Sequence, residues 1–313
     1  MAGGGGGQGL VLALGGGGAK GLAHIGVLAE LHAQGIPVRA VAGTSVGAEI
    51  GAFFATGMPI EALQEVATGF DWIKTLRLFF PDLPTGGIAS GASIMDFLTP
   101  HLGERRIEDL EIGFVAIATD LETGEQVVLD RGSLSEAVRA SLSVPGLLAP
   151  FRIGARLLVD GGVVNPVPVD VAREHFGGPV LGVAVHAGAR GLSKREMQPR
   201  PSGEWRGRVR QLLQQPWLGP ADGLRIWLNE QLKEPPPEDV EAWGTRRVLD
   251  QVIGIGQAQI TQLRAQRYPP DLMLTPDVHD IGMVEFYRAV EAIDAGRRAV
   301  QDRLDAIRKL SSK

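Results

Sequence analysis

The sequence contains no cysteine. This absence excludes disulfides, thiol nucleophiles and metal sites with cysteine ligands. The chain also lacks an apolar run of the ~18–20 residues that a membrane-spanning helix needs. Its first residues show neither the basic region nor the apolar region of a secretory signal. We therefore expect a cytoplasmic protein that contacts membranes only peripherally, if at all.

An excess of positive charge is also missing. The 313 residues include 31 Lys and Arg against 36 Asp and Glu, for a formal net charge of −5. Nucleic-acid-binding proteins usually carry a basic excess, so we expect no nucleic-acid partner. Apolar residues make up 44% of the chain and charged residues 21%, which is ordinary for a globular protein able to bury a sizeable core.

Glycine, in contrast, is abundant, with 43 residues, and much of it lies between apolar runs. Residues 10–14 and 38–42 have the pattern of strands, and residues 20–34 and 46–56 that of helices. This alternation favours an α/β fold with a largely parallel sheet. Further expected elements are a hairpin over 114–119 and 125–129, a helix over 133–142, strands at 156–159 and 180–185, and amphipathic helices over 248–266 and 286–307.

Composition shifts along the chain predict its organisation. Residues 1–9 read as a flexible Gly-rich tail, and residues 10–313 as one catalytic domain. Within this domain we expect a core over about 10–185, an interrupting segment over about 190–245 and C-terminal helices over about 246–310. The segment 205–232 mixes arginines with tryptophans, a composition suited to an anionic membrane surface, although a pair of packed helices is nearly as good an interpretation.

Several aromatic residues are candidates for the wall of a lipid pocket. Core packing is the favoured interpretation for Phe53 and Phe54, which lie in the predicted helix over 46–56. Trp72, Phe79 and Phe80 follow in a separate apolar stretch.

The first glycine loop has three interpretations. Gly16-x-Gly18-x-x-Gly21 matches a dinucleotide fingerprint, but no acidic residue ends the following strand, as that fingerprint requires. A phosphate-binding P-loop would need Gly-Lys-Ser/Thr where this chain has Gly-Leu after Lys20. The remaining functional interpretation is a nest of N–H groups at a helix N-terminus that stabilises a developing oxyanion. A tight packing turn is the structural alternative.

An oxyanion site requires a nucleophile, and the next loop offers one. Gly43-Thr44-Ser45-Val46-Gly47 is a G-x-S-x-G motif between a predicted strand and a predicted helix, the setting in which this motif forms a nucleophile elbow. The helix that begins after Ser45 directs its positive dipole end at the hydroxyl and favours an alkoxide. We therefore predict Ser45 as the nucleophile.

Two residues compete as the base for Ser45. The usual α/β-hydrolase order of Ser, acid and His favours His279, the only late histidine in a loop. Asp160 is the better candidate, because it ends a β-type run and precedes Gly161 and Gly162, which permit a sharp turn and close approach of another backbone. Asp120 is the second acidic candidate, with a hairpin-turn role favoured for it.

Four motifs together resemble the patatin-like phospholipases, and in particular short bacterial members similar to the catalytic domain of neuropathy target esterase. They are the loop 16–21, the elbow 43–47, the stretch "ASLSVPGLLAPF" over 140–151 and Asp160-Gly161-Gly162, in the family's order and approximate spacing. The resemblance covers roughly residues 10–185.

The resemblance implies a three-layer α/β/α fold and a Ser–Asp dyad without histidine that hydrolyses acyl esters of lipids. Carried onto this chain, Ser45 is the nucleophile and Asp160 accepts its proton. The loop Gly16, Gly17, Gly18 and Ala19 supplies the oxyanion hole, Lys20 and Gly21 anchor that loop, and Pro145 shapes a wall. The implied substrate is a phospholipid, a lysophospholipid or another fatty-acyl ester, and no cofactor or metal is expected.

Overall fold

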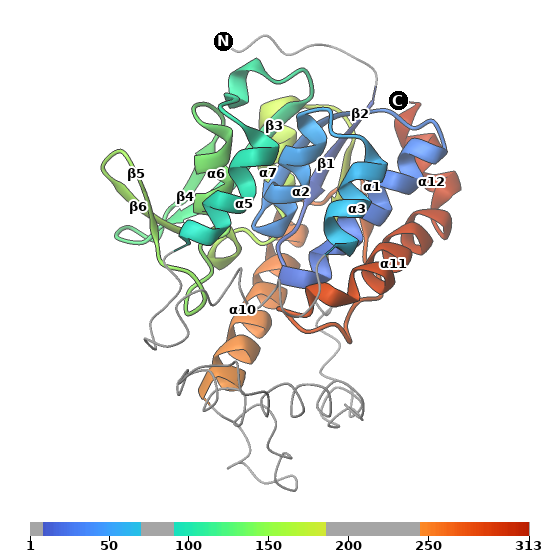
Figure 1. The fold of residues 1–313 in the computed structure, drawn as a ribbon. Coiled ribbons are helices and arrows are strands. Elements are labelled where there is room, and N and C mark those ends of the chain that lie inside the picture. Colours follow the sequence, from blue (N-terminus) through green and yellow to red (C-terminus); the bar gives the residue numbers. More distant parts are fainter. Residues whose placement is uncertain (1–8, 70–90, 186–244, 313) are drawn as a thin grey trace, which may run out of the picture.

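The computed structural model describes residues 9–69, 91–185 and 245–312 (Figure 1). The predictions for the tail over residues 1–8, for Trp72, Phe79 and Phe80, and for the segment 205–232 lie outside the described residues. In the part of the chain that is described, no helix is long and apolar enough to cross a membrane.

The centre of the fold is an eight-stranded sheet whose main path runs β5-β6-β3-β2-β1-β7-β8, with β4 paired to β3. Neighbouring strands from β3 through β2, β1 and β7 to β8 are parallel, and β4, β5 and β6 form antiparallel pairs at one side. The strands are β1 Leu10–Leu14, β2 Val38–Thr44, β3 Gly113–Asp120, β4 Gln126–Leu129, β5 Phe151–Ile153, β6 Arg156–Asp160, β7 Val180–Val183 and β8 Leu272–Leu274.

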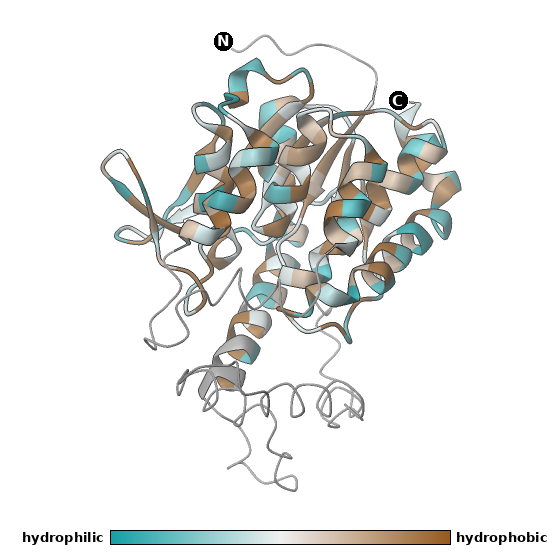
Figure 2. Ribbon diagram, viewed as in Figure 1, coloured by the Kyte–Doolittle hydropathy of each residue, from teal (hydrophilic) through white to brown (hydrophobic). Residues whose placement is uncertain are grey.

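Helices cover both faces of this sheet, so the predicted three-layer α/β/α architecture is confirmed (Figure 1). β1 is buried along its whole length, and its residues alternate between the two cores: Leu10, Leu12 and Leu14 face one, Val11 and Ala13 the other. Apolar residues concentrate on the strands and on the inner sides of the helices, and polar residues on the outer side of α11 (Figure 2).

The helices divide unequally between the two faces. One face carries α1 Ala23–Ala33, α2 Val46–Ala55, α3 Ile60–Thr68, α5 Ala92–Leu102, α6 Leu134–Ser141 and α11 Ala289–Gln301, followed by α12 Leu304–Ser311. The other face is covered by α7 Val169–Phe176, against which α10 Thr245–Arg267 packs.

Most of the helices and strands predicted from the sequence are present in the structure, and two of the predicted helices need correction. The predicted helix over 20–34 opens as a 3₁₀ helix, η1 Gly18–Leu22, before α1 begins. The predicted helix over 286–307 is divided into η6 Phe286–Arg288, α11 and α12, with a break at Asp302 and Arg303. No local pattern predicted α3, α5, α7, β5 or β8.

Candidate active site

The glycine loop and the serine elbow lie together at the carboxyl edge of the sheet. β1 and β2 are adjacent and parallel, with Leu14 in register with Gly43, so the loops that follow them emerge side by side. Because the chain proceeds from β1 to β2 on one side and reaches β7 on the other, this edge is also a topological switch point, the usual place for ligands in such sheets.

Ser45 occupies a strained turn between β2 and α2. Its φ of 56° and ψ of −128° make it the only non-glycine residue with positive φ in the described chain, at a cost of about 1–3 kcal/mol. Small neighbours permit this turn: a Cβ on Gly47 would lie 2.3 Å from the Leu14 carbonyl oxygen, and a Cβ on Gly43 2.5 Å from Cα of Ala48. Ser45 therefore stands at the N-cap of α2, as the elbow motif predicts.

Buried hydroxyl groups hold the elbow in place. The Ser45 N–H donates to Oγ of Ser141 at 2.8 Å, and that hydroxyl donates to the Ile117 carbonyl at 2.6 Å. On the other side, Oγ1 of Thr44 donates to the Asn165 carbonyl at 2.9 Å. Ser141 lies in the quoted "ASLSVPGLLAPF" stretch, but its function as a support for Ser45 was not predicted.

Asp160 ends β6 and is 2% exposed, while Ser45 is 4% exposed. Oδ1 of Asp160 accepts the Gly162 N–H at 2.6 Å, and Oδ2 has no hydrogen-bond partner among the described residues. Burial raises the pKa of Asp160 to about 6, while the nearby Ser45 hydroxyl and the Gly162 N–H act in the opposite direction. The two predicted catalytic side chains are thus neighbours, without a well-formed hydrogen bond between them.

Close contacts surround the two glycines after Asp160, with backbone at Gly161 and with the Gln257 side chain at Gly162. A Cβ on Gly161 would lie 2.3 Å from the Ile117 carbonyl oxygen, and one on Gly162 would lie 2.5 Å from Nε2 of Gln257. The same carbonyl of Ile117 accepts the Ser141 hydroxyl that supports the elbow. These contacts join the Asp160 turn and the Ser45 turn through one strand, β3.

Two of the backbone N–H groups in the glycine loop 16–19 donate hydrogen bonds to other segments of the chain, and two do not. The Gly16 N–H donates to the Pro166 carbonyl at 3.0 Å, and the Ala19 N–H donates to the Met283 carbonyl at 2.8 Å. The N–H groups of Gly17 and Gly18 bond to no other described residue. This corrects the prediction that all four residues donate to an oxyanion: in this conformation only Gly17 and Gly18 have N–H groups to offer.

Lys20 and Gly21, the predicted anchors of this loop, contact two neighbouring segments. Nζ of Lys20 donates to the His279 carbonyl at 3.5 Å. Gly21 packs against the first residue of α2, where an added Cβ would lie 2.0 Å from Cγ1 of Val46. The loop is therefore held against both α2 and the segment 276–285.

His24 supports the loop from beneath, a function that the sequence analysis did not assign. Its buried ring bonds through Nε2 to the Gly15 carbonyl at 2.7 Å. Burial lowers the pKa of His24 to about 4, so the ring is neutral at physiological pH and Nε2–H is the donor.

The competing candidate His279 lies apart from this constellation. It is on an exposed loop, its side chain is 47% exposed, and its ring bonds to the Asp277 carboxylate rather than to Ser45 or Asp160. Asp120 has the hairpin-turn role favoured for it, since its Oδ1 accepts the N–H groups of Glu122 and Thr123.

One wall of the site is organised by Arg139, which is 1% exposed. Its guanidinium donates to Oγ of Ser143 at 2.6 Å and to the Ala149 carbonyl at 3.1 Å, and lies 5.3 Å from the centre of the Phe151 ring. The Ser143 carbonyl in turn accepts the Asp160 N–H at 2.9 Å. Arg139 therefore fixes the stretch around Pro145 and, through Ser143, the backbone of Asp160.

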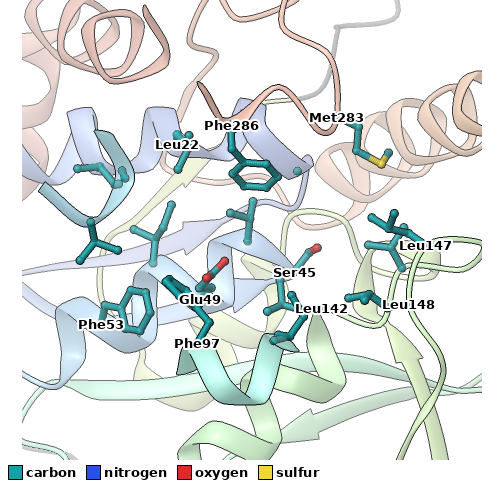
Figure 3. A pocket seen from close by; sticks show the side chains of 18 of the residues that line it. Leu22, Ser45, Glu49, Phe53, Phe97, Leu142, Leu147, Leu148, Met283 and Phe286 are labelled. Atoms are coloured by element: carbon teal, nitrogen blue, oxygen red, sulfur yellow. The ribbon is translucent and has the colours of Figure 1, made fainter. Parts of the chain in front are cut away.

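A pocket of about 810 Å³, counted out to its opening, adjoins Ser45 and follows α2 into the protein (Figure 3). Phe53 is both buried in the core and part of the lining, whereas Phe54 does not line it. The lining is almost wholly apolar and includes Leu22, Ile25, Ile50, Leu63, Phe97, Leu142, Leu147, Leu148 and Phe286. Such a pocket suits a hydrocarbon chain.

Comparison with known proteins identifies the family to which the chain belongs. The family model described as patatin-like phospholipase matches residues 12–173, a range that holds the loop, the elbow and the Asp160 turn. The chain belongs to the patatin-like phospholipase family. This membership makes it a lipid acyl hydrolase.

Relatives extend this similarity beyond the matched range. An NTE family protein of Mycobacterium tuberculosis is 31% identical over 331 residues, covering 95% of this chain and 91% of the relative. Patatin-like phospholipase domain-containing protein 7 of Rattus norvegicus is 37% identical over 193 residues, covering 59% of this chain and 14% of the relative. Among solved structures, VipD from Legionella pneumophila superposes with a TM-score of 0.38 and 14% identity, covering 96% of this chain and 80% of VipD.

Proposed function

We propose that this phospholipase-family chain hydrolyses a fatty-acyl ester, a phospholipid or lysophospholipid, with Ser45 and Asp160 as a catalytic dyad. The observation that carries the proposal is the placement of a strained, buried serine beside a buried carboxylate, with an apolar pocket that adjoins the serine. The acyl chain would occupy this pocket, with its ester carbonyl at Ser45.

The dyad mechanism needs only groups that the chain supplies. Oγ of Ser45 attacks the ester carbonyl carbon while its proton passes to Asp160, and the tetrahedral oxyanion is stabilised by the N–H groups of Gly17 and Gly18. The C–O bond to the leaving alcohol then breaks, and the alcohol takes the proton from Asp160. A water molecule then attacks the acyl carbonyl carbon while its proton passes to Asp160. The bond from this carbon to Oγ of Ser45 breaks, Oγ takes the proton back from Asp160, and the fatty acid is released.

The environment of Asp160 favours this function. A carboxylate with an ordinary pKa is a weak base toward a hydroxyl group, and burial raises the pKa of Asp160 to about 6. At neutral pH such a group is still mostly ionised, so it is ready to accept a proton and is a stronger base than an exposed aspartate. The unpartnered Oδ2 is free to receive the Ser45 proton.

Hydrolysis of p-nitrophenyl esters and of a lysophospholipid by four proteins tests the proposal. We expect Ser45→Ala and Asp160→Asn each to lower kcat by about 10³-fold or more, as loss of a nucleophile or its base does in other serine hydrolases. His279→Ala, the matched control on the exposed loop, should retain activity. An inactive His279→Ala beside an active Asp160→Asn would instead establish a Ser–His–Asp triad.

A further inference from the structure

Glu49 is the only charged residue among the described residues that line the apolar pocket. It lies on α2 four residues after Ser45, and the same face of the helix continues to Phe53. Figure 3 shows the Glu49 carboxyl between Ser45 and Phe53, directed into the pocket. A substrate chain that leaves Ser45 along α2 therefore has to pass this carboxyl group.

The Glu49 side chain has no hydrogen bond or ion pair with any described residue. Its surroundings disfavour charge, and desolvation raises the pKa of Glu49 to about 7. An aliphatic side chain at this position would continue the apolar lining formed by Val46 and Ile50. Glu49 is only partly buried, and its unpaired carboxyl faces the pocket, so it is available to a hydrogen-bond donor of a ligand that enters there.

We propose that Glu49 selects acyl chains that carry a hydroxyl group a few carbons from the ester carbonyl. This inference rests on the proposed function, because it places the carbonyl carbon at Ser45. The hydroxyl would donate a hydrogen bond to the Glu49 carboxylate, and the rest of the chain would pack against the apolar lining.

Helix geometry sets the position of this hydroxyl. Four residues of α-helix rise about 6 Å. An extended chain advances about 1.2 Å per bond, as a polypeptide does. An extended chain covers this rise in about five bonds, so its sixth carbon lies level with the backbone of Glu49. Because helix side chains tilt toward the N-terminus, the carboxyl reaches back from there toward about the third carbon, where a 3-hydroxyacyl ester carries its hydroxyl group.

The test compares p-nitrophenyl decanoate with p-nitrophenyl 3-hydroxydecanoate, two esters that differ only in the hydroxyl group. We expect the wild-type kcat/KM to be about tenfold or more higher for the hydroxylated ester. In Glu49→Leu this ratio should fall at least tenfold, with a higher kcat/KM for the plain ester. Glu49→Gln keeps a hydrogen-bonding group and should retain an intermediate preference.

Glu65→Leu is the matched control, since it makes the same substitution at an exposed position of α3. It should leave the ratio of the two esters unchanged. A second readout avoids catalysis: Ser45→Ala should bind methyl 3-hydroxydecanoate more tightly than methyl decanoate, and Ser45→Ala/Glu49→Leu should reverse this order.

The outcomes separate this inference from the proposed function. If Ser45→Ala abolishes hydrolysis of both esters while Glu49→Leu leaves their ratio unchanged, the inference is wrong and the proposed function stands. An equal loss on both esters in Glu49→Leu would also overturn it, because Glu49 would then act on the reaction and not on the chain. If Ser45→Ala remains active, the proposed function fails and the inference fails with it.

Discussion

At the scale of single residues, Asp160 combines burial with the function that we propose for it, which requires an ionised carboxylate. Its carboxyl is almost completely enclosed, and the Gly162 N–H and the Ser45 hydroxyl offset only part of the desolvation. The resulting pKa of about 6 lies well above the ordinary ~3.9 of an aspartate. The same burial that disfavours the carboxylate thus makes it a better proton acceptor.

The pH profile of hydrolysis should report this pKa. Only the ionised form of Asp160 accepts the Ser45 proton, so we expect kcat/KM to be constant above neutrality and to fall about tenfold per pH unit below about pH 6. Steady-state rates between pH 4 and pH 8 measure this directly. A profile that stays flat down to pH 4 would show that Asp160 is not the base, and circular dichroism at each pH excludes unfolding as the cause of a decline.

At the scale of elements, α1 and α11 cross so closely that their backbones touch. A Cβ on Gly26 of α1 would lie 1.9 Å from the Ile293 carbonyl oxygen of α11. Reciprocally, a Cβ on Gly296 of α11 would lie 1.9 Å from the Ala23 carbonyl oxygen. The two glycines therefore set the distance between the helix that follows the glycine loop and the helix that follows the segment covering it.

Gly26→Ala should separate these helices and lower the free energy of unfolding by about 3 kcal/mol, because a methyl group cannot fit between two backbones. Urea denaturation followed by circular dichroism provides the measurement. Gly254→Ala in α10 is the control, since nothing lies within 4 Å of its Cβ position and alanine should add up to about 1 kcal/mol of helix stability there. If Gly26→Ala and the wild type were equally stable, the backbones of α1 and α11 could not lie as close together as described.

Elements with a strong local pattern could be predicted, and those that depend on distant partners could not. The runs at β1, β2 and α2 are long, apolar and bounded by glycines, and the structure places them as expected. β8 has only three residues and is a strand because β7 provides its partner. α5 contains Pro100, which argues against a helix, and the break between α11 and α12 contains neither proline nor glycine.

In the candidate site too, features with a local sequence pattern could be predicted, and features that depend on distant residues could not. The motifs around Ser45 and Asp160 are local in sequence, and the structure brings the two residues together as neighbours. The use of the Ala19 N–H by Met283 depends on a residue near the other end of the chain, which no local pattern indicates. Glu49, however, left a signal that was not used: it is the single charge in the apolar helix "VGAEIGAFFA".

At the scale of the whole molecule, a buried polar network joins α10 to the serine elbow. The Arg264 guanidinium donates to Oδ2 of Asp170 at 2.5 Å, and Oδ1 of Asp170 accepts the Asn165 side chain at 2.9 Å. The Asn165 carbonyl accepts the Thr44 hydroxyl beside Ser45. Through these bonds a helix far along the chain supports the residue that precedes the nucleophile.

Arg264→Met should lower the free energy of unfolding by about 2–3 kcal/mol, below the ~3–5 kcal/mol of a fully enclosed pair because the Arg264 side chain is 28% exposed. Loss of the hydrogen bond between Arg264 and Asp170 should also lower kcat more than it raises KM. Denaturation and steady-state kinetics measure the two effects. The double variant Arg264→Met/Asp170→Asn removes the orphaned charge and should recover part of the stability, whereas additive losses would mean that the two residues are not coupled.

The contact between Ala19 and Met283 has a consequence for the synthesis of the protein. The glycine loop is synthesised well before residues 283–301, which supply both the carbonyl that holds it and the helix that packs beneath it. A nascent chain still short of these residues contains Ser45 and Asp160, but its glycine loop lacks this support. We therefore expect a ribosome-bound chain to gain hydrolase activity only after residue 301 has been added.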